Sequence, residues 1–262
     1  MLHRSVLLAA LLLLGGCLGR VEVSQIETWR QNVAAQSTPS AKPRLWYIGV
    51  GLYDESWSEN DVADLGARLV SKADGFQVVP VVFSNRIEAK QYPAASRANI
   101  DAAAAEIARQ ARPGDVALLY LSTHGARGLV ARKETGGGVE PVGPSELREW
   151  LLPLRNVNTV VVLSACFSGS LMPVLDSDNR IVVAAARYDR TSFGCQAGAE
   201  HTVFGQALLD SLDMPHESLK TMVAKVRAAV SKREQEMGIR LKSEPQVDVG
   251  AAAMPLYDAP VF

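Results

Sequence analysis

The sequence predicts an α/β protein, a three-layer sandwich in which helices cover both faces of a mainly parallel central sheet. From residue 44 onward, apolar runs rich in β-branched residues alternate with segments whose apolar positions repeat about every 3.6 residues. Alternation of strands and helices is typical of parallel sheets with helices on both sides. Hydrophobic residues make up 48% of the chain, which is enough to fill the core of such a fold.

The first half of the domain provides two strands and two helices. The first strand is expected over residues 45–50, and Ser58 opens a helix with apolar residues on one face. A second strand over residues 76–83 is followed by a helix that Asn99 caps. The sequence then turns at Pro113 and the residues after it.

The second half continues the alternation, and the glycines at 136–138 are interpreted as part of a mobile surface loop. The predicted elements are a strand over 116–121, a short helix over 144–150, strands over 160–163 and 181–186, and helices over 203–212 and 219–237.

The N-terminus is typical of an exported, lipid-anchored protein. A basic start precedes an apolar run too short to span a bilayer, and the run ends in Gly15, Gly16 and Cys17. This ending resembles the lipobox of bacterial lipoproteins, whose Cys is lipidated; an ordinary signal peptide is the alternative. We expect a periplasm-facing location on a bacterial envelope membrane. The predicted divisions are a signal peptide over 1–17, a polar tether over 18–43 with room for a helix over 26–35, and one domain over 44–262.

The composition limits which ligands and macromolecular partners are expected. A net charge of −1 argues against a nucleic-acid partner, and the four His form no motif for a metal, so neither a metal nor a cofactor is expected. Of the three Cys, lipidation of Cys17 leaves Cys166 and Cys195. An exported compartment permits a disulfide between them, and that bond remains an alternative. The sequence does not indicate an oligomeric state.

Two short motifs point to chemistry. His124-Gly125 follows the strand over 116–121, and Ala165-Cys166 follows the strand over 160–163. In open α/β sheets the carboxyl ends of the strands form the ligand-binding edge. A thiol becomes a useful nucleophile beside an imidazole, so the pair suggests a hydrolase with a Cys nucleophile.

The same residues carry a family resemblance over roughly residues 44–249. The order of His-Gly after one central strand and Ala-Cys after the next resembles the legumain-like (hemoglobinase, asparaginyl endopeptidase) cysteine peptidases, whose fold is shared with caspases. Ser168-Gly169 after the Cys is similar as well, and the segment 185–195 is similar to bacterial lipoprotein members. The resemblance implies a caspase-like sandwich and a cysteine endopeptidase acting on peptides or proteins.

The resemblance also implies roles. Cys166 would attack the scissile carbonyl, forming a thioester, and His124 would protonate the leaving amine. The backbone N–H groups of Gly125 and Cys166 would bind the oxyanion. Asp189 and Arg190 are candidate substrate-binding residues after the strand over 181–186, with a surface ion pair or a helix cap as the alternative.

Two other functions stay open. A relative in the family acts as a transamidase, so ligation could replace hydrolysis. A catalytically inactive envelope lipoprotein, using the fold as a binding module, would follow if a disulfide disabled Cys166. For the peptidase we expect a bell-shaped pH dependence, with the imidazolium of His124 lowering the pKa of Cys166.

Overall fold

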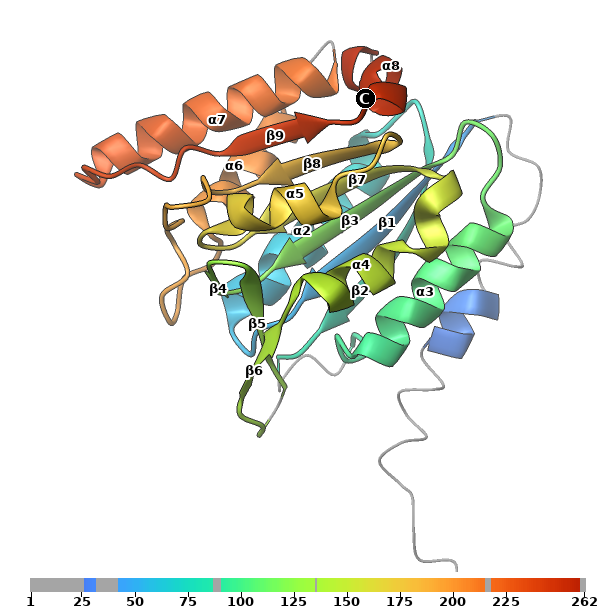
Figure 1. Cartoon of the computed structure of the whole chain (residues 1–262), viewed down its shortest axis with the longest axis horizontal. Coiled ribbons are helices and arrows are strands. Elements are labelled where there is room, and N and C mark those ends of the chain that lie inside the picture. The colour runs from blue at the N-terminus through green and yellow to red at the C-terminus, as the bar shows by residue number, and fades with distance from the viewer. Residues whose placement is uncertain (1–25, 32–41, 87–90, 135, 215–217, 260–262) are drawn as a thin grey trace, which may run out of the picture.

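The computed structural model describes residues 26–31, 42–86, 91–134, 136–214 and 218–259. A six-stranded sheet in the order β2-β1-β3-β7-β8-β9 forms the centre, and a three-stranded sheet β4-β5-β6 lies at one end (Figure 1). The strands of the large sheet are β1 (Arg44–Gly51), β2 (Gln77–Ser84), β3 (Val116–Ser122), β7 (Asn158–Ser164), β8 (Arg180–Ala184) and β9 (Gln246–Val249). Those of the small sheet are β4 (Gly125–Ala126), β5 (Leu129–Lys133) and β6 (Val139–Val142).

Helices cover both faces of the large sheet, which confirms the predicted sandwich. The helices are α2 (Ser56–Lys72), α3 (Arg97–Gln110), α4 (Pro144–Leu151), α5 (Met172–Leu175), α6 (Val203–Leu212), α7 (Leu219–Glu236) and α8 (Met254–Asp258), with single 3₁₀ turns η1 (Pro153–Asn156), η2 (Ser168–Leu171) and η3 (Ala251–Ala253). Figure 1 shows α3, α4 and α5 in front of the sheet, with α2 and α6 behind it.

The alternating side chains of each strand supply two separate cores. On β1, Trp46 and Ile48 pack with the helices α3, α4 and α5, whereas Leu45 and Tyr47 pack with α2, α6 and α7. Every strand neighbour from β2 to β8 runs parallel, so the ends of β1, β3, β7 and β8 lie along one edge. The sheet therefore gathers the strand-end motifs at a single edge.

Two helix starts differ from the predictions. Ser96, and not Asn99, caps α3, because its hydroxyl accepts the N–H of Asn99 at 3.3 Å. Helix α2 begins at Ser56, before Ser58, whose buried hydroxyl instead donates to the carbonyl of Ser122 at 2.7 Å. Ser58 therefore ties the start of α2 to the end of β3.

The sequence prediction lacks β9 and the small sheet. Strand β9 adds antiparallel to β8, and β4, β5 and β6 follow β3 as antiparallel neighbours. The glycines predicted in a surface loop lie in the connection between β5 and β6, where Gly136 has a φ of 71°. A positive φ suits Gly because it has no side chain to clash with the backbone.

The N-terminal predictions lie mostly outside the described residues, including the signal peptide, Cys17 and most of the tether. Residues 26–31 are helical, within the predicted helix. Ile26 is buried in the core, and the indole N–H of Trp29 donates to the Pro80 carbonyl at 3.1 Å. Across the described part of the chain, no helix has the length and apolar character needed to cross a membrane.

Candidate active site

The pairing of β3 with β7 brings the two motifs side by side. Ser122 and Ser164 are register partners, and His124 and Cys166 each follow two residues later. The contact continues past the strands, because the N–H of Thr123 donates to the carbonyl of Ser164 at 3.0 Å. His124 and Cys166 therefore leave the same edge of the sheet on neighbouring strands.

Cys166 is half-buried against the segment that follows β8. The N–H of Ser192 donates to its Sγ at 3.3 Å, and the Ser192 hydroxyl lies 3.6 Å from the same sulfur. Cys195 is the other neighbour, and both cysteines are free thiols rather than the disulfide that the sequence left open.

Cys166 and Cys195 differ in charge because they share a proton. Hydrogen bonding with Cys195 is the largest cause that lowers the pKa of Cys166, to about 6; burial opposes it and Ser192 reinforces it. The same contact, with burial, raises the pKa of Cys195 far above that of an ordinary thiol. At neutral pH the pair therefore holds one proton, with Cys166 as the thiolate and Cys195 as the S–H donor.

The surroundings of His124 are different, and they come from the segment between β1 and α2 together with the first turn of α2. Tyr53 and Trp57 meet its ring edge-on, with ring centroids 4.4 Å and 5.1 Å away. Burial lowers the pKa of His124 below its ordinary value, against an opposing effect from the charge of Glu55. The imidazole is thus predominantly neutral at pH 7. The low pKa of Cys166 comes from Cys195 and Ser192, which corrects the expectation that His124 causes it.

Gly125 fills the junction between the two strand ends. A Cβ at this position would collide with the carbonyl oxygen of Cys166 and lie 3.0 Å from the Cβ of Ala165. The N–H of Ala131 donates to the carbonyl of His124, so the Gly125–Val130 pair is of the type without direct hydrogen bonds. The Gly125 N–H therefore points away from β5, where it is available to an oxyanion.

The residues after Cys166 are fixed at both ends. Phe167 has a φ of 57°, which is rare for an aromatic residue, and its N–H donates to the Arg190 carbonyl at 2.7 Å. The Ser168 hydroxyl accepts the N–H of Ala186 at 3.1 Å. A Cβ on Gly169 would lie 2.8 Å from the Ala186 carbonyl, so the Ser-Gly pair lets this turn dock on the end of β8.

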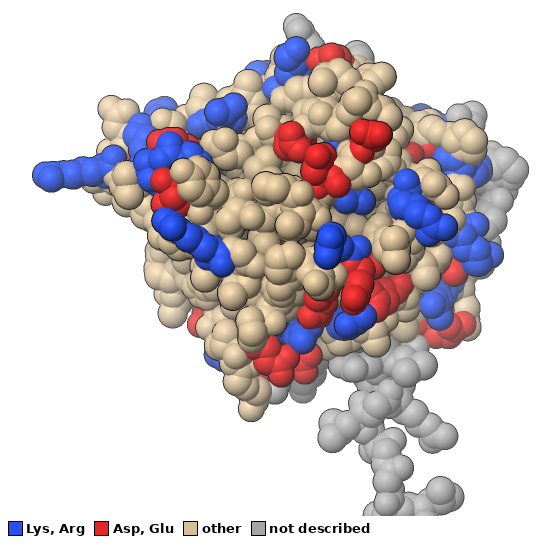
Figure 2. All heavy atoms as spheres, viewed as in Figure 1, with Lys and Arg blue, Asp and Glu red and all other residues tan. Residues whose placement is uncertain are grey.

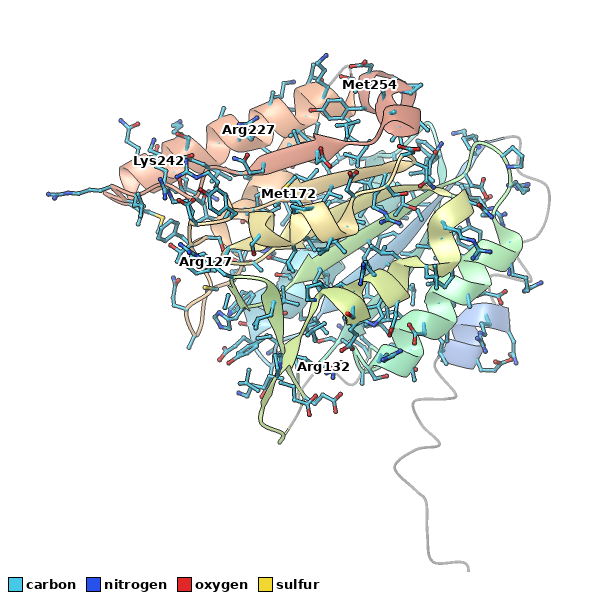
Figure 3. The ribbon with its side chains drawn as sticks, viewed as in Figure 1. Arg127, Arg132, Met172, Arg227, Lys242 and Met254 are labelled. Carbon is cyan, nitrogen blue, oxygen red and sulfur yellow. The ribbon has the colours of Figure 1, made fainter. Side chains whose placement is uncertain are left out.

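The loops after β3 and β7 also contact one another. The N–H of Gly128 donates to the hydroxyl of Ser170 at 2.9 Å. Arg127, labelled in Figure 3, lies on the turn between β4 and β5, with its guanidinium carbon 6.0 Å from the centroid of the Phe167 ring. The small sheet thus fixes one side of the turn that follows Cys166.

Comparison with known proteins identifies the family. Residues 79–252, which include β3, β7 and both motifs, match the Peptidase C13 family. The chain belongs to the Peptidase C13 family. This is the legumain family, and the protein is a cysteine-type peptidase with a caspase-like fold. The family implies a peptide or protein substrate.

A solved structure supports the fold independently. The crystal structure of caspase-1 from Spodoptera frugiperda is similar with a TM-score of 0.52 and 18% sequence identity. The match covers 79% of this chain and 86% of the caspase chain. At that identity the likeness concerns the fold alone. A search of curated proteins found no match.

In this C13 peptidase, a buried carboxylate hydrogen-bonds to Ser122, the last residue of β3 before the His124 motif. The sequence-based prediction did not include this carboxylate. Asp61, with no exposed surface, accepts hydrogen bonds from the hydroxyls of Ser122 at 2.8 Å and Thr202 at 2.7 Å. His201 Nδ1 lies 3.3 Å from the same carboxylate, which raises the pKa of His201. A signal was present, because Asp61 lies four residues before Leu65, on the apolar face of α2.

Asp189 and Arg190 take part in an ion network. Arg187 binds Asp189 through two nitrogens, at 2.6 Å and 3.1 Å, and Arg190 binds the same carboxylate at 2.9 Å. Arg187 also contacts Glu244 at 2.6 Å. This matches the ion-pair alternative and leaves the substrate-binding role of both residues a prediction.

On the face seen in Figure 2, charges of both signs are interspersed.

Among the described residues, no group of His, Cys, Asp and Glu is arranged to hold a metal ion.

Proposed function

We propose that this C13 peptidase is an endopeptidase in which Cys166 is the nucleophile and His124 the proton carrier. The observation that supports the assignment most is the β3–β7 register, which puts both residues at one sheet edge. The thiolate character of Cys166 adds to it, since the thiolate is the attacking species.

The reaction follows from these groups. The thiolate of Cys166 attacks the scissile carbonyl carbon, and the oxyanion takes hydrogen bonds from the N–H groups of Gly125 and Cys166. The C–N bond then breaks as the imidazolium of His124 gives its proton to the leaving amine, which leaves a thioester on Cys166. His124, now neutral, accepts a proton from water as that water attacks the thioester, and the acid departs with the thiolate restored.

The test is peptide hydrolysis by the full chain under reducing conditions. We expect Cys166→Ala to abolish cleavage of a fluorogenic peptide library, because no other group at the site carries a reactive thiolate. A matched control, Cys17→Ser, lies outside the domain and should cleave like the wild type in detergent. Equal hydrolysis by wild type and Cys166→Ala would overturn the proposal.

A lipid anchor at Cys17 is the second part of the proposal, supported by the small residues before it in the sequence. The chain would face the periplasm from a bacterial envelope membrane. Mass spectrometry of the extracted protein should find acyl chains on Cys17, and Cys17→Ser should lose them. An unmodified Cys17 in the mature wild type would contradict the anchor.

The substrate preference is proposed to involve Asp189 and Arg190. Kinetics on peptides with Lys, Asp or Asn before the scissile bond should shift in Asp189→Asn and Arg190→Gln if either contacts the substrate. Unchanged preference in both variants would make the network structural. Adding an amine nucleophile to the same assay distinguishes hydrolysis from transamidation by the product formed.

A further inference from the structure

We propose that Cys166 and Cys195 form a reversible oxidation site, at which low-molecular-weight disulfides join the two thiols and block the nucleophile. The proposal rests on the function assigned to Cys166 above. The structure holds the reduced form, with both thiols free and half-buried. The chemical class of the modifying agent is an organic disulfide of the glutathione type.

Several contacts hold Cys195 beside Cys166. The N–H of Ser192, three residues before Cys195, donates to Cys166 Sγ at 3.3 Å. The carbonyl of Phe193 accepts the N–H of Val203 at 2.9 Å, which fixes the segment from its other side. Cys195 lies close enough to Cys166 for the interaction between the two thiols to be the largest cause that lowers the pKa of Cys166.

Gly194 allows the close return of this segment. Its φ is 88°, and a Cβ there would lie 2.6 Å from the nitrogen of Val203. Further along, the Ser56 hydroxyl donates to the Ala199 carbonyl at 3.1 Å, so the segment is also tied to the start of α2. The position of Cys195 is therefore set by the fold and not by an unsupported loop.

The two thiols have the properties of an attacking and a resolving cysteine. Attack on a disulfide needs a thiolate, and Cys166 is the thiolate of the pair. It displaces one thiolate from the organic disulfide and keeps the other half as a mixed disulfide. Cys195 then gives its proton to water and attacks the Cys166 sulfur, which expels the second thiolate. Both expelled thiolates take up protons from water. One organic disulfide is reduced to two thiols, and one protein disulfide forms.

Such a bond would have a protective consequence. A thiolate that remains exposed to peroxide is oxidised through sulfenic acid to irreversible acids. A neighbouring thiol diverts the first step to a disulfide, which thiols can reverse. The peptidase would then be inactive while the bond is present and would recover when thiols reduce it.

The experiment uses the full chain with Cys17→Ser, so that Cys166 and Cys195 are its only thiols. The protein is treated with oxidised glutathione, and peptide mapping by mass spectrometry follows the products. We expect a peptide pair linked through Cys166 and Cys195, loss of hydrolysis, and recovery of both thiols and hydrolysis with dithiothreitol. In Cys195→Ser, glutathione should instead remain attached to Cys166.

Three outcomes would overturn the proposal. They are a lasting glutathione adduct on Cys166 when Cys195 is present, a disulfide between two chains, and no reaction at either thiol. Comparing Cys195→Ser with Cys195→Ala separates the resolving role, lost in both, from the hydrogen-bond donor, which Ser keeps. Peptide mapping does not depend on turnover. If the Cys166–Cys195 bond forms but the reduced protein hydrolyses no peptide, the proposed function is refuted and the oxidation site is not.

Discussion

The walls around Cys166 and His124 differ in chemistry, although the two residues leave neighbouring strands. Cys166 lies beside Cys195 and the N–H of Ser192, which both lower the pKa of its thiol, and the carbonyl of Ser192 also lies 3.5 Å from its sulfur. His124 lies against the rings of Tyr53 and Trp57, where burial disfavours positive charge. The surroundings of Cys166 favour the thiolate, and those of His124 favour the neutral imidazole.

The difference teaches how the resting site is prepared. In a thiolate–imidazolium pair each charge stabilises the other, whereas here each residue is tuned by its own surroundings. The nucleophile is ready before substrate arrives, and the proton donor is the scarcer species at neutral pH. Substitutions around Cys166 should therefore change the pKa of Cys166 without changing that of His124, and substitutions around His124 should do the reverse.

The largest effect is expected from His124→Ala. Loss of the proton donor should reduce turnover by roughly 10²–10⁴-fold. The pKa of Cys166, measured by iodoacetamide alkylation across pH, should stay low, because Cys195 and Ser192 remain. An alkylation pKa that rises toward the ordinary value of ~8.5 would show that the two residues are coupled after all.

The second-largest effect is expected from Gly125→Ala, because the added Cβ collides with the carbonyl oxygen of Cys166 where the ends of β3 and β7 meet. Displacing one oxyanion donor costs roughly 10²–10³-fold in turnover. Gly138→Ala, whose Cβ would meet nothing within 4 Å, is the matched control. Similar kcat values for both variants would remove Gly125 from the oxyanion site.

The pH dependence of kcat/KM should be a narrow bell with a mildly acidic optimum. The rate rises as Cys166 loses its proton, with a pKa of about 6, and falls as His124 loses its own. Burial lowers the pKa of His124, so the falling limb lies below the ~6.5 of a free imidazole. Rates measured across the acid and neutral range would contradict this if they formed a plateau extending to alkaline pH.

Cys195→Ala should raise the pKa of Cys166 toward that of an ordinary thiol, since it removes the donor that lowers that pKa most. Alkylation rates across pH measure the shift. Cys195→Ser keeps an O–H donor at the same place and should show a smaller rise. Identical rises in both variants would mean that the donor is not what stabilises the thiolate.

The smallest effect is expected from Tyr53→Ala, which opens one side of the His124 ring to water. The pKa of His124 should rise toward its ordinary value, because burial is what lowers it. NMR titration of the imidazole C–H signals gives the value. His201, whose pKa is raised by Asp61, serves as an internal control in the same spectrum. A lower pKa for His124 would mean that contact with the ring favours the charged form.

The central strands and the placement of His124 and Cys166 could be predicted because buried parallel strands appear as continuous apolar runs. The short strands could not, because β4 has two residues and β9 is half-buried without alternation. The start of α3 was misplaced because Ser96 and Asn99 are both good capping residues. Local patterns identify strongly apolar elements and leave their ends undecided.

By itself the sequence determined the α/β sandwich, its main strands and the edge at which a thiol and an imidazole meet. Only the tertiary structure decided what surrounds each of them. Cys195 and Ser192 reach Cys166 through a segment after β8, and Tyr53 reaches His124 from the end of β1. Spacing along the chain carries no record of such neighbours, because they meet only when separate loops fold over one sheet edge. The charge of each group depends on those neighbours.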